Sequence, residues 1–291
     1  MNKGLNSLHP FTSFFYFIGF MILTMTLLHP IYLITGLIIM IGLNYCIDRG
    51  TQLRSYLPFY LFMGITIALV NPLFSHRGRM ILFYFMDQPI TGEAVVYGLT
   101  MMLSLLCVLV SFVAYNQVMT SGKFLFLFSK AFQKMGLLVM MAVRFVPLVK
   151  RRMNQIMVVQ KTRGVNPFVG PLRKRLKDAV LILQIVVTWS LEEALQTSDS
   201  MKARGYGILE KRSSYHSYRF RKMDGVVLFL LIITGSICMT GSFLGYGVLA
   251  IYPKLKWDGF HGLQWLFYFS FILFTMVPIL IEGRESMKWR S

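Results

Sequence analysis

The sequence predicts an all-α membrane protein with about six transmembrane helices and two or three long cytoplasmic or interfacial helices. Hydrophobic residues make up 55% of the 291 residues and charged residues only 14%, whereas soluble domains average about 45–50% apolar and about 25% charged residues. The mean hydropathy is accordingly positive, at +0.58. The apolar residues also gather in long runs, which a soluble core would not need.

Six apolar stretches predict transmembrane helices, because about 20 apolar residues cross a bilayer. Helices are expected rather than strands, since the alternation typical of a barrel is absent and lipid offers no hydrogen-bond partner to an open backbone. A further apolar run, Met80–Met86, is too short to span and is expected at the interface or against the bundle. The six stretches are Phe11–Leu28, Ile31–Ile47, Tyr56–Leu73 (the weakest, which ends at Asn71-Pro72), Ala94–Tyr115, Val226–Ala250 and Leu263–Ile281.

Residues 117–225 are strongly basic. They hold 20 of the 30 lysines and arginines but only six of the 12 acidic residues, which gives them a net charge of +14 out of +18. Such an excess beside transmembrane helices marks the cytoplasmic side. The chain is therefore expected to divide into transmembrane helices in 1–116, a cytoplasmic region in 117–225 and transmembrane helices in 226–291, with both termini in the cytoplasm.

The basic charge favours contact with anionic lipid headgroups, to which pairing with an acidic protein partner can add. Nucleic acid is not an expected partner, because no base-reading motif accompanies the charge and the segment is tethered between transmembrane helices.

The basic region predicts two long helices. Residues 121–162 contain few helix breakers, and Pro147 is expected to kink or split the first helix. Within it, Met135–Val149 is almost entirely apolar and flanked by basic residues, which is typical of a helix that lies against the membrane interface. The second helix is expected to start at Pro171 and to run to about Arg204, with leucine and valine at mostly helical spacing.

Both helices end in a basic residue followed by glycine: Arg163-Gly164 and Arg204-Gly205. A cation complements the carboxyl-terminal dipole of a helix and glycine favours its left-handed cap, so a single such end indicates only a helix terminus. Two such ends on paired helices of a membrane protein favour a functional interpretation as well.

With this pair of ends, the sequence resembles the transmembrane T component of energy-coupling factor (ECF) transporters, the EcfT/CbiQ family. Ala203-Arg204-Gly205 matches the second of the family's two Ala-Arg-Gly motifs, and Arg163-Gly164 matches the first, with Thr162 where the family usually has a small residue. Arg144-Phe145-Val146-Pro147 is similar to the family's Arg-x-x-Pro stretch, and Leu8-His9-Pro10 to the segment that often precedes the first transmembrane helix.

The resemblance implies a subunit of an ATP-driven importer in a bacterial or archaeal cytoplasmic (inner) membrane. The two helices would be coupling helices, and their ends would dock on two ECF-type ATPase subunits, or on a homodimer of one. The apolar stretch would cradle a substrate-binding (S-type) membrane subunit, and the cargo would be a vitamin or a transition-metal ion. The implied ATPase contacts are Arg163, Gly164, Ala203, Arg204 and Gly205, and the implied contacts to the substrate-binding subunit are Met135, Leu138, Met141 and Val146.

Other classes of protein are less well supported by the sequence. It contains no phosphate-binding loop and no hydrolase or zinc-protease motif, and its five histidines are scattered, so we expect neither an enzyme nor a bound metal or cofactor. An autonomous secondary transporter or channel is the main alternative, but such proteins usually need ionisable residues at membrane depth, and charged residues are nearly absent from the six stretches. A membrane-embedded enzyme and a structural scaffold are further alternatives.

Overall fold

The computed structural model describes residues 8–75, 78, 80–85, 88–131, 133–206, 208, 220–249 and 262–288. The chain forms two compact units, one made of Met1–Phe124 with Tyr218–Ser291 and the other of Leu125–Ser217. The described residues are predominantly helical, which confirms the all-α membrane class. The division into 1–116, 117–225 and 226–291 stays a prediction.

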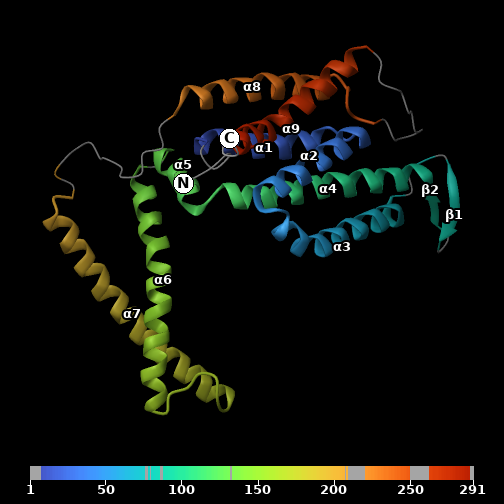
Figure 1. The fold of residues 1–291 in the computed structure, drawn as a ribbon. Helices are drawn as coiled ribbons and strands as arrows, with labels where there is room; N and C mark the ends of the chain where they lie inside the picture. Colours follow the sequence, from blue (N-terminus) through green and yellow to red (C-terminus); the bar gives the residue numbers. More distant parts are fainter. Residues whose placement is uncertain are drawn as a thin grey trace. The chain divides into compact units, whose positions relative to one another are not determined.

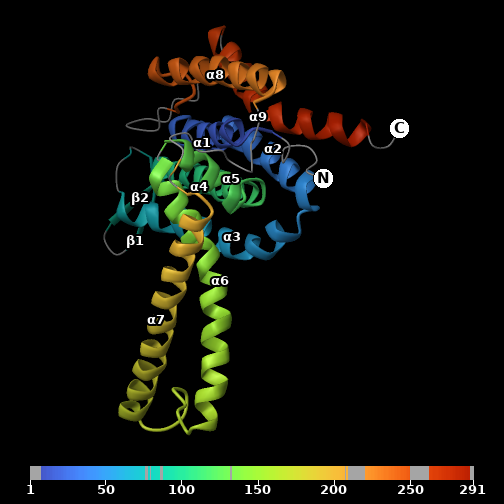
Figure 2. The ribbon, with the colours of Figure 1, turned by 90° about the vertical axis from the view of Figure 1, so that its left-hand side faces the viewer.

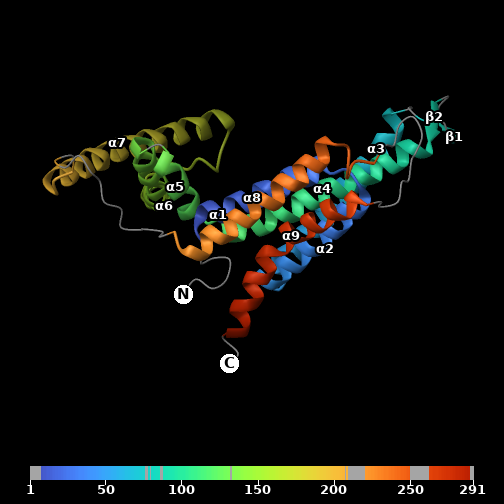
Figure 3. The same ribbon diagram turned by 90° about the horizontal axis from the view of Figure 1, so that it is seen from above.

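The first unit is a bundle in which the helices run side by side (Figures 1 and 3). Helix α4 packs against α1, α2 and α3, while α9 packs against α2 and α8. Its helices are α1 (Pro10–Thr26), α2 (Pro30–Asp48), α3 (Thr51–Phe74), α4 (Gly92–Val118), α8 (Lys222–Phe243) and α9 (Leu263–Lys288).

Five helices in the described part of the chain, α2, α3, α4, α8 and α9, are long and apolar enough to cross a membrane. The remaining predicted span corresponds to α1, a shorter apolar helix of 17 residues, or about 26 Å at 1.5 Å per residue. The third span is longer than expected, since α3 begins at Thr51 and continues through Pro58 and Pro72. Proline is tolerated in transmembrane helices because neighbouring groups satisfy the freed backbone.

Aromatic rings opposite glycines form the centre of this bundle. Phe20, Phe271 and Phe274 are almost fully buried. A Cβ atom at Gly36 would lie 3.2 Å from the Phe271 ring, and one at Gly19 would lie 2.9 Å from the Phe274 ring. Small residues let membrane helices approach closely, so these two glycines provide the space in which the rings pack.

A two-stranded antiparallel hairpin lies between α3 and α4 in the sequence. It consists of β1 (Ile81–Phe85) and β2 (Gln88–Thr91). The apolar run expected at the interface or against the bundle is therefore largely a strand, while Met86 lies outside the described residues. The Glu93 carboxylate accepts the Met80 N–H at 3.2 Å, which ties the start of the hairpin to the first turn of α4.

The second unit is built on two long antiparallel helices, α6 (Gln133–Thr162) and α7 (Leu172–Ala203), which follow α5 (Ser121–Ala131) (Figures 1 and 2). Helix α6 is continuous through Pro147, so of the expected kink or split the split is not found. Asp178, Ile182 and Val186 are the buried positions of α7. They recur every four residues and therefore share one face of the helix.

Candidate functional site: two matched helix ends

The first Arg-Gly pair ends α6 in a Schellman motif. Gly164 has φ +79°, and its N–H donates to the Lys161 carbonyl at 3.1 Å. The N–H of Val165 donates to the Gln160 carbonyl at 3.0 Å. These two bonds satisfy carbonyls that would otherwise lack a partner at the helix end. Arg163 occupies the cap position, and its side chain is exposed.

The second pair ends α7 in the same motif. Gly205 also has φ +79°. Its N–H donates to the Lys202 carbonyl at 2.9 Å, and the N–H of Tyr206 donates to the Met201 carbonyl at 3.0 Å. Arg204 occupies the cap position and is exposed. The two ends therefore share one backbone geometry, with arginine and glycine at equivalent positions.

The cap geometry calls for the glycines, whereas the helix dipole favours any cation at the arginine positions. A Cβ atom at Gly164 would meet nothing within 4 Å, so the positive φ, rather than a lack of space, calls for glycine there. In the described part of the chain, no hydrogen bond or ion pair engages the guanidinium group of Arg163 or Arg204. The two exposed guanidinium groups, each with N–H donors arranged in a fork, are thus free to bind a carboxylate, a phosphate or a row of carbonyl groups.

The two ends are far apart. Arg163 precedes the short loop that leads into α7, and Arg204 caps the far end of that helix (Figure 1). Helix α7 has 32 residues, so the two ends are separated by about 48 Å at 1.5 Å per residue. A single small groove on one partner cannot hold both arginines.

The loop after the first end is held by α7. The Asp178 carboxylate accepts the N–H of Asn166 at 3.0 Å, and the Arg175 side chain donates to the Pro167 carbonyl at 3.1 Å. The Asn166 side chain in turn accepts the Phe168 N–H at 3.1 Å. Our sequence analysis missed Asp178. The signal that could have found it is a lone acidic residue directly after a basic run.

The four residues predicted to contact the substrate-binding subunit do not share one environment. Leu138 is 60% exposed and Val146 is 66% exposed, so both present apolar surface. Met141 is half-buried and lines a cavity between α6 and α7. The side chain of Met135 lies outside the described residues.

Helix α7 contributes a second apolar surface. Its leucines and valines at three- and four-residue spacing are mostly exposed, with exposed fractions between 49% and 72%. They lie away from the face that holds Asp178, Ile182 and Val186. The residues are Leu172, Leu176, Val180, Leu183, Val187, Leu191 and Leu195.

No metal site is evident in the part of the chain that the structure describes. The histidines, cysteines and carboxylates there form no group of three or more that could hold a metal ion. Of the three free cysteines, Cys107 and Cys238 are buried in the first unit and Cys46 is exposed.

The fold and these two ends define a multi-pass α-helical membrane protein that presents two matched, arginine-bearing helix ends. A family model described as CbiQ, cobalt transport protein, matches residues 5–215. Because this match covers well over half of the sequence, the chain belongs to the CbiQ family.

Curated relatives agree with this assignment. The chain is 32% identical over 112 residues to the energy-coupling factor transporter transmembrane protein EcfT of Bacillus selenitireducens, covering 38% of this chain and 42% of that protein. It is 27% identical over 202 residues to EcfT of Acidaminococcus fermentans, covering 64% of this chain and 74% of the relative. A third match, to EcfT of Leuconostoc gelidum, is 32% identical over 99 residues, or 34% of this chain and 37% of the relative. The first and third matches thus span only about two fifths of the relatives' length.

Proposed function

We propose that this chain is the transmembrane coupling subunit of an ECF-type ATP-driven importer, which transmits ATPase motion to a substrate-binding membrane subunit. The observation that carries the proposal is the pair of identical Arg-Gly helix ends on two packed helices of a CbiQ-family protein. The family and relatives are named for transport, and the helix dipole favours any basic residue at these ends without calling for arginine.

Each arginine would contact one ATPase subunit, in a pair of different chains or in a homodimer. A guanidinium group forms two parallel hydrogen bonds to a carboxylate or to neighbouring carbonyls. The separation of about 48 Å along α7 suits two docking sites on two subunits. The glycine that follows each arginine has no side chain, so the backbone of a partner can approach the cap closely.

The helix pair would transmit the motion. Helix α6 has 30 residues, so it is about 45 Å long at 1.5 Å per residue. Its Arg152 lies over the Trp189 ring of α7, 5.3 Å from the ring centroid, and Ile182 and Val186 are buried along α7. A displacement applied at either helix end would therefore change the angle between two rigid helices, and would not be absorbed by a flexible loop.

The substrate-binding subunit would rest on the exposed apolar residues of this pair. Leu138 and Val146 of α6 supply part of that surface, and the exposed leucines of α7 enlarge it. Methionine side chains such as Met140, which is 51% exposed, adapt to partners that must slip or exchange. The cargo, a vitamin or a transition-metal ion, would be selected by the other subunit.

The basic residues set the proposed orientation. Residues 117–225 would face the cytoplasm and the anionic lipid of a bacterial or archaeal cytoplasmic membrane, with both termini on that same side. The five described spans together with α1 give an even number of crossings, which is consistent with this topology.

Substrate uptake in proteoliposomes tests the proposal. The chain would be reconstituted with its ATPase subunits and one substrate-binding subunit, and uptake of that subunit's substrate would be measured with and without ATP. Arg204→Glu should abolish ATP-dependent uptake without reducing membrane insertion. Arg173→Glu makes the same charge change at an exposed position of α7 and should retain uptake. Full uptake by Arg204→Glu would overturn the coupling role.

A further inference from the structure

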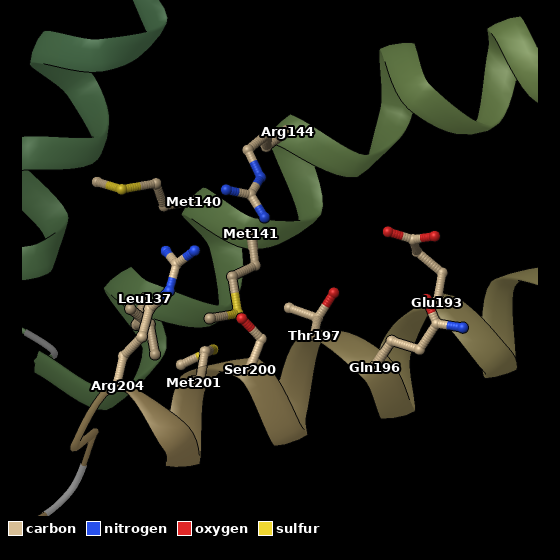
Figure 4. A pocket seen from close by; sticks show the side chains of 10 residues that line it. All are labelled: Leu137, Met140, Met141, Arg144, Glu193, Gln196, Thr197, Ser200, Met201 and Arg204. Atoms are coloured by element: carbon tan, nitrogen blue, oxygen red, sulfur yellow. The ribbon is translucent and has the colours of Figure 1, made fainter.

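A cavity of about 590 Å³ lies inside the second unit, between the first half of α6 and the last third of α7 (Figure 4). Arg144 comes from α6 and Arg204 from the end of α7, and both side chains line it. We propose that this cavity binds the headgroup of an anionic phospholipid. The phosphodiester would lie between Arg144 and Arg204, and the first acyl methylenes would lie against Leu137 and Met141.

The charges of the cavity favour a monoanionic ligand. Arg144, Arg204 and Glu193 are its charged lining residues, so one positive charge remains uncompensated. Figure 4 shows both guanidinium groups toward one end of the cavity and Glu193 toward the other. Glu193 lies 11 residues before Arg204, or about 16 Å along the helix. A phosphodiester carries the single negative charge that would balance the arginines, and its oxygens match their forked donors.

Neither arginine has a direct partner among the described residues. No hydrogen bond or ion pair engages either guanidinium group there. The Ser200 hydroxyl lines the same cavity and can donate a hydrogen bond to a phosphate oxygen. Two like charges that converge on an open cavity raise the local affinity for an anion.

The apolar part of the wall favours a lipid over a free anion or an acidic side chain. Leu137, Met140 and Met141 line the cavity beside the arginines. The neighbouring Leu138 and Val143 are exposed by 60% and 47%, so apolar surface flanks the cavity on both sides of α6. The volume falls within the range of about 300–1,000 Å³ found for small-molecule sites, and a single carboxylate would leave most of it unfilled.

Arg144 is the position that separates this proposal from the coupling role. Arg204 would take part in both, whereas Arg144 reaches the cavity from α6, belongs to neither Arg-Gly end and is not among the proposed ATPase contacts. Lipid binding can be measured on the isolated full-length chain. A failure of the lipid proposal is therefore distinguishable from a failure of the coupling proposal, which requires the ATPase subunits.

Native mass spectrometry of the detergent-purified chain provides the test, with dioleoyl phosphatidylglycerol and dioleoyl phosphatidylcholine as probes. We expect wild type to retain phosphatidylglycerol in preference to phosphatidylcholine. Arg144→Gln should weaken phosphatidylglycerol binding by about tenfold or more, because one charge-assisted contact is lost. Arg144→Lys keeps the charge but lacks the forked N–H donors of a guanidinium group. Its affinity for phosphatidylglycerol should lie between those of wild type and Arg144→Gln. The matched control Arg151→Gln, an exposed arginine of α6 outside the cavity, should bind like wild type.

A thermal melt of each variant checks that it is folded. Undiminished phosphatidylglycerol binding by folded Arg144→Gln would overturn the proposal, as would equal retention of the two lipids. Displacement of the lipid by millimolar inorganic phosphate would show a free-anion site instead. If wild type binds no lipid, and Arg144→Gln instead loses its ATPase subunits in co-purification, the cavity receives an acidic protein group and the proposal fails.

Discussion

Asp224 and His9 are 215 positions apart in sequence, yet a side-chain oxygen of Asp224 accepts the His9 N–H at 3.0 Å. The other oxygen accepts the Arg221 N–H at 2.9 Å, and Asp224 is only 2% exposed. One buried carboxylate thus fixes the starts of α1 and α8 to each other. Within the first unit, this contact anchors the chain where α8 begins.

Replacement of Asp224 by alanine should therefore destabilise the protein by about 1–3 kcal/mol or more, because two buried N–H groups lose their acceptor. Asp224→Asn keeps one acceptor oxygen and should cost less. Thermal unfolding in detergent, followed by circular dichroism, measures the difference. Asp199→Ala, at an exposed aspartate of α7, is the control. An Asp224→Ala melt that matches this control would show that the contact contributes nothing.

The glycine at each helix end should be needed for backbone reasons. Gly164→Ala should cost about 1 kcal/mol of stability, because an L-residue is strained at φ +79°, although the added methyl group meets no neighbour. Gly122 of α5 also has open space around it but no positive φ. Gly122→Ala should therefore be neutral or stabilising, as alanine favours helices. Equal effects of the two substitutions on the unfolding midpoint would rule out the strain argument.

Lys123 should make stability depend on pH. Its Nζ donates to the Val118 carbonyl near the end of α4, at 3.0 Å, and burial lowers the pKa of this ammonium group to about 8 from its ordinary 10.5. Between these two values the folded chain has released the proton that the unfolded chain still binds. Stability contributed by this group is therefore absent below pH 8 and is gained as the pH rises toward 10.5.

The measurement is the unfolding midpoint of wild type and Lys123→Met from pH 7 to pH 10. The difference between the two proteins should shift in favour of wild type as the pH rises. Parallel curves over the whole range would mean that Lys123 titrates alike in the folded and unfolded chains.

Asp178 should order the loop that carries the first Arg-Gly end. Asp178→Ala removes the acceptor of the Asn166 N–H, so amide hydrogen exchange in residues 165–170 should speed up by about tenfold or more. The end at Gly205 has its own cap bonds and should exchange as in wild type. Asp199→Ala is again the matched control. Unchanged protection of the loop would assign its order to the other bonds around Asn166 and Pro167.

The sequence predicted those features that depend on local chemistry. Gly164 and Pro171 mark where α6 ends and α7 begins, because left-handed backbone and a missing N–H have recognisable residue preferences. The transmembrane helices follow from hydrophobic runs alone. The matched Arg-Gly ends could be identified for the same reason, although their separation along α7 required the fold.

Other features do not follow from local sequence patterns. Helix α6 continues through Pro147, since the loss of one backbone bond is small beside the many that remain in a 30-residue helix. A short apolar run such as Ile81–Phe85 does not distinguish strand from helix. The bond from Asp178 to Asn166 joins residues 12 positions apart. Periodicity gave α7 an apolar face but not which residues would remain uncovered.

Co-purification with ATPase subunits tests the coupling role most directly. The tagged chain would be co-expressed with ECF-type ATPases and purified from detergent, as wild type, as the double variant Arg163→Glu with Arg204→Glu, and as the control double variant Arg151→Glu with Arg173→Glu. The controls make the same charge change at exposed positions that are not among the proposed ATPase contacts, Arg151 within α6 and Arg173 in the first turn of α7. We expect wild type and the control to retain the ATPases and the first double variant to lose them. A folded wild-type chain that retains no ATPase, or a first double variant that retains as much as wild type, would contradict the coupling role.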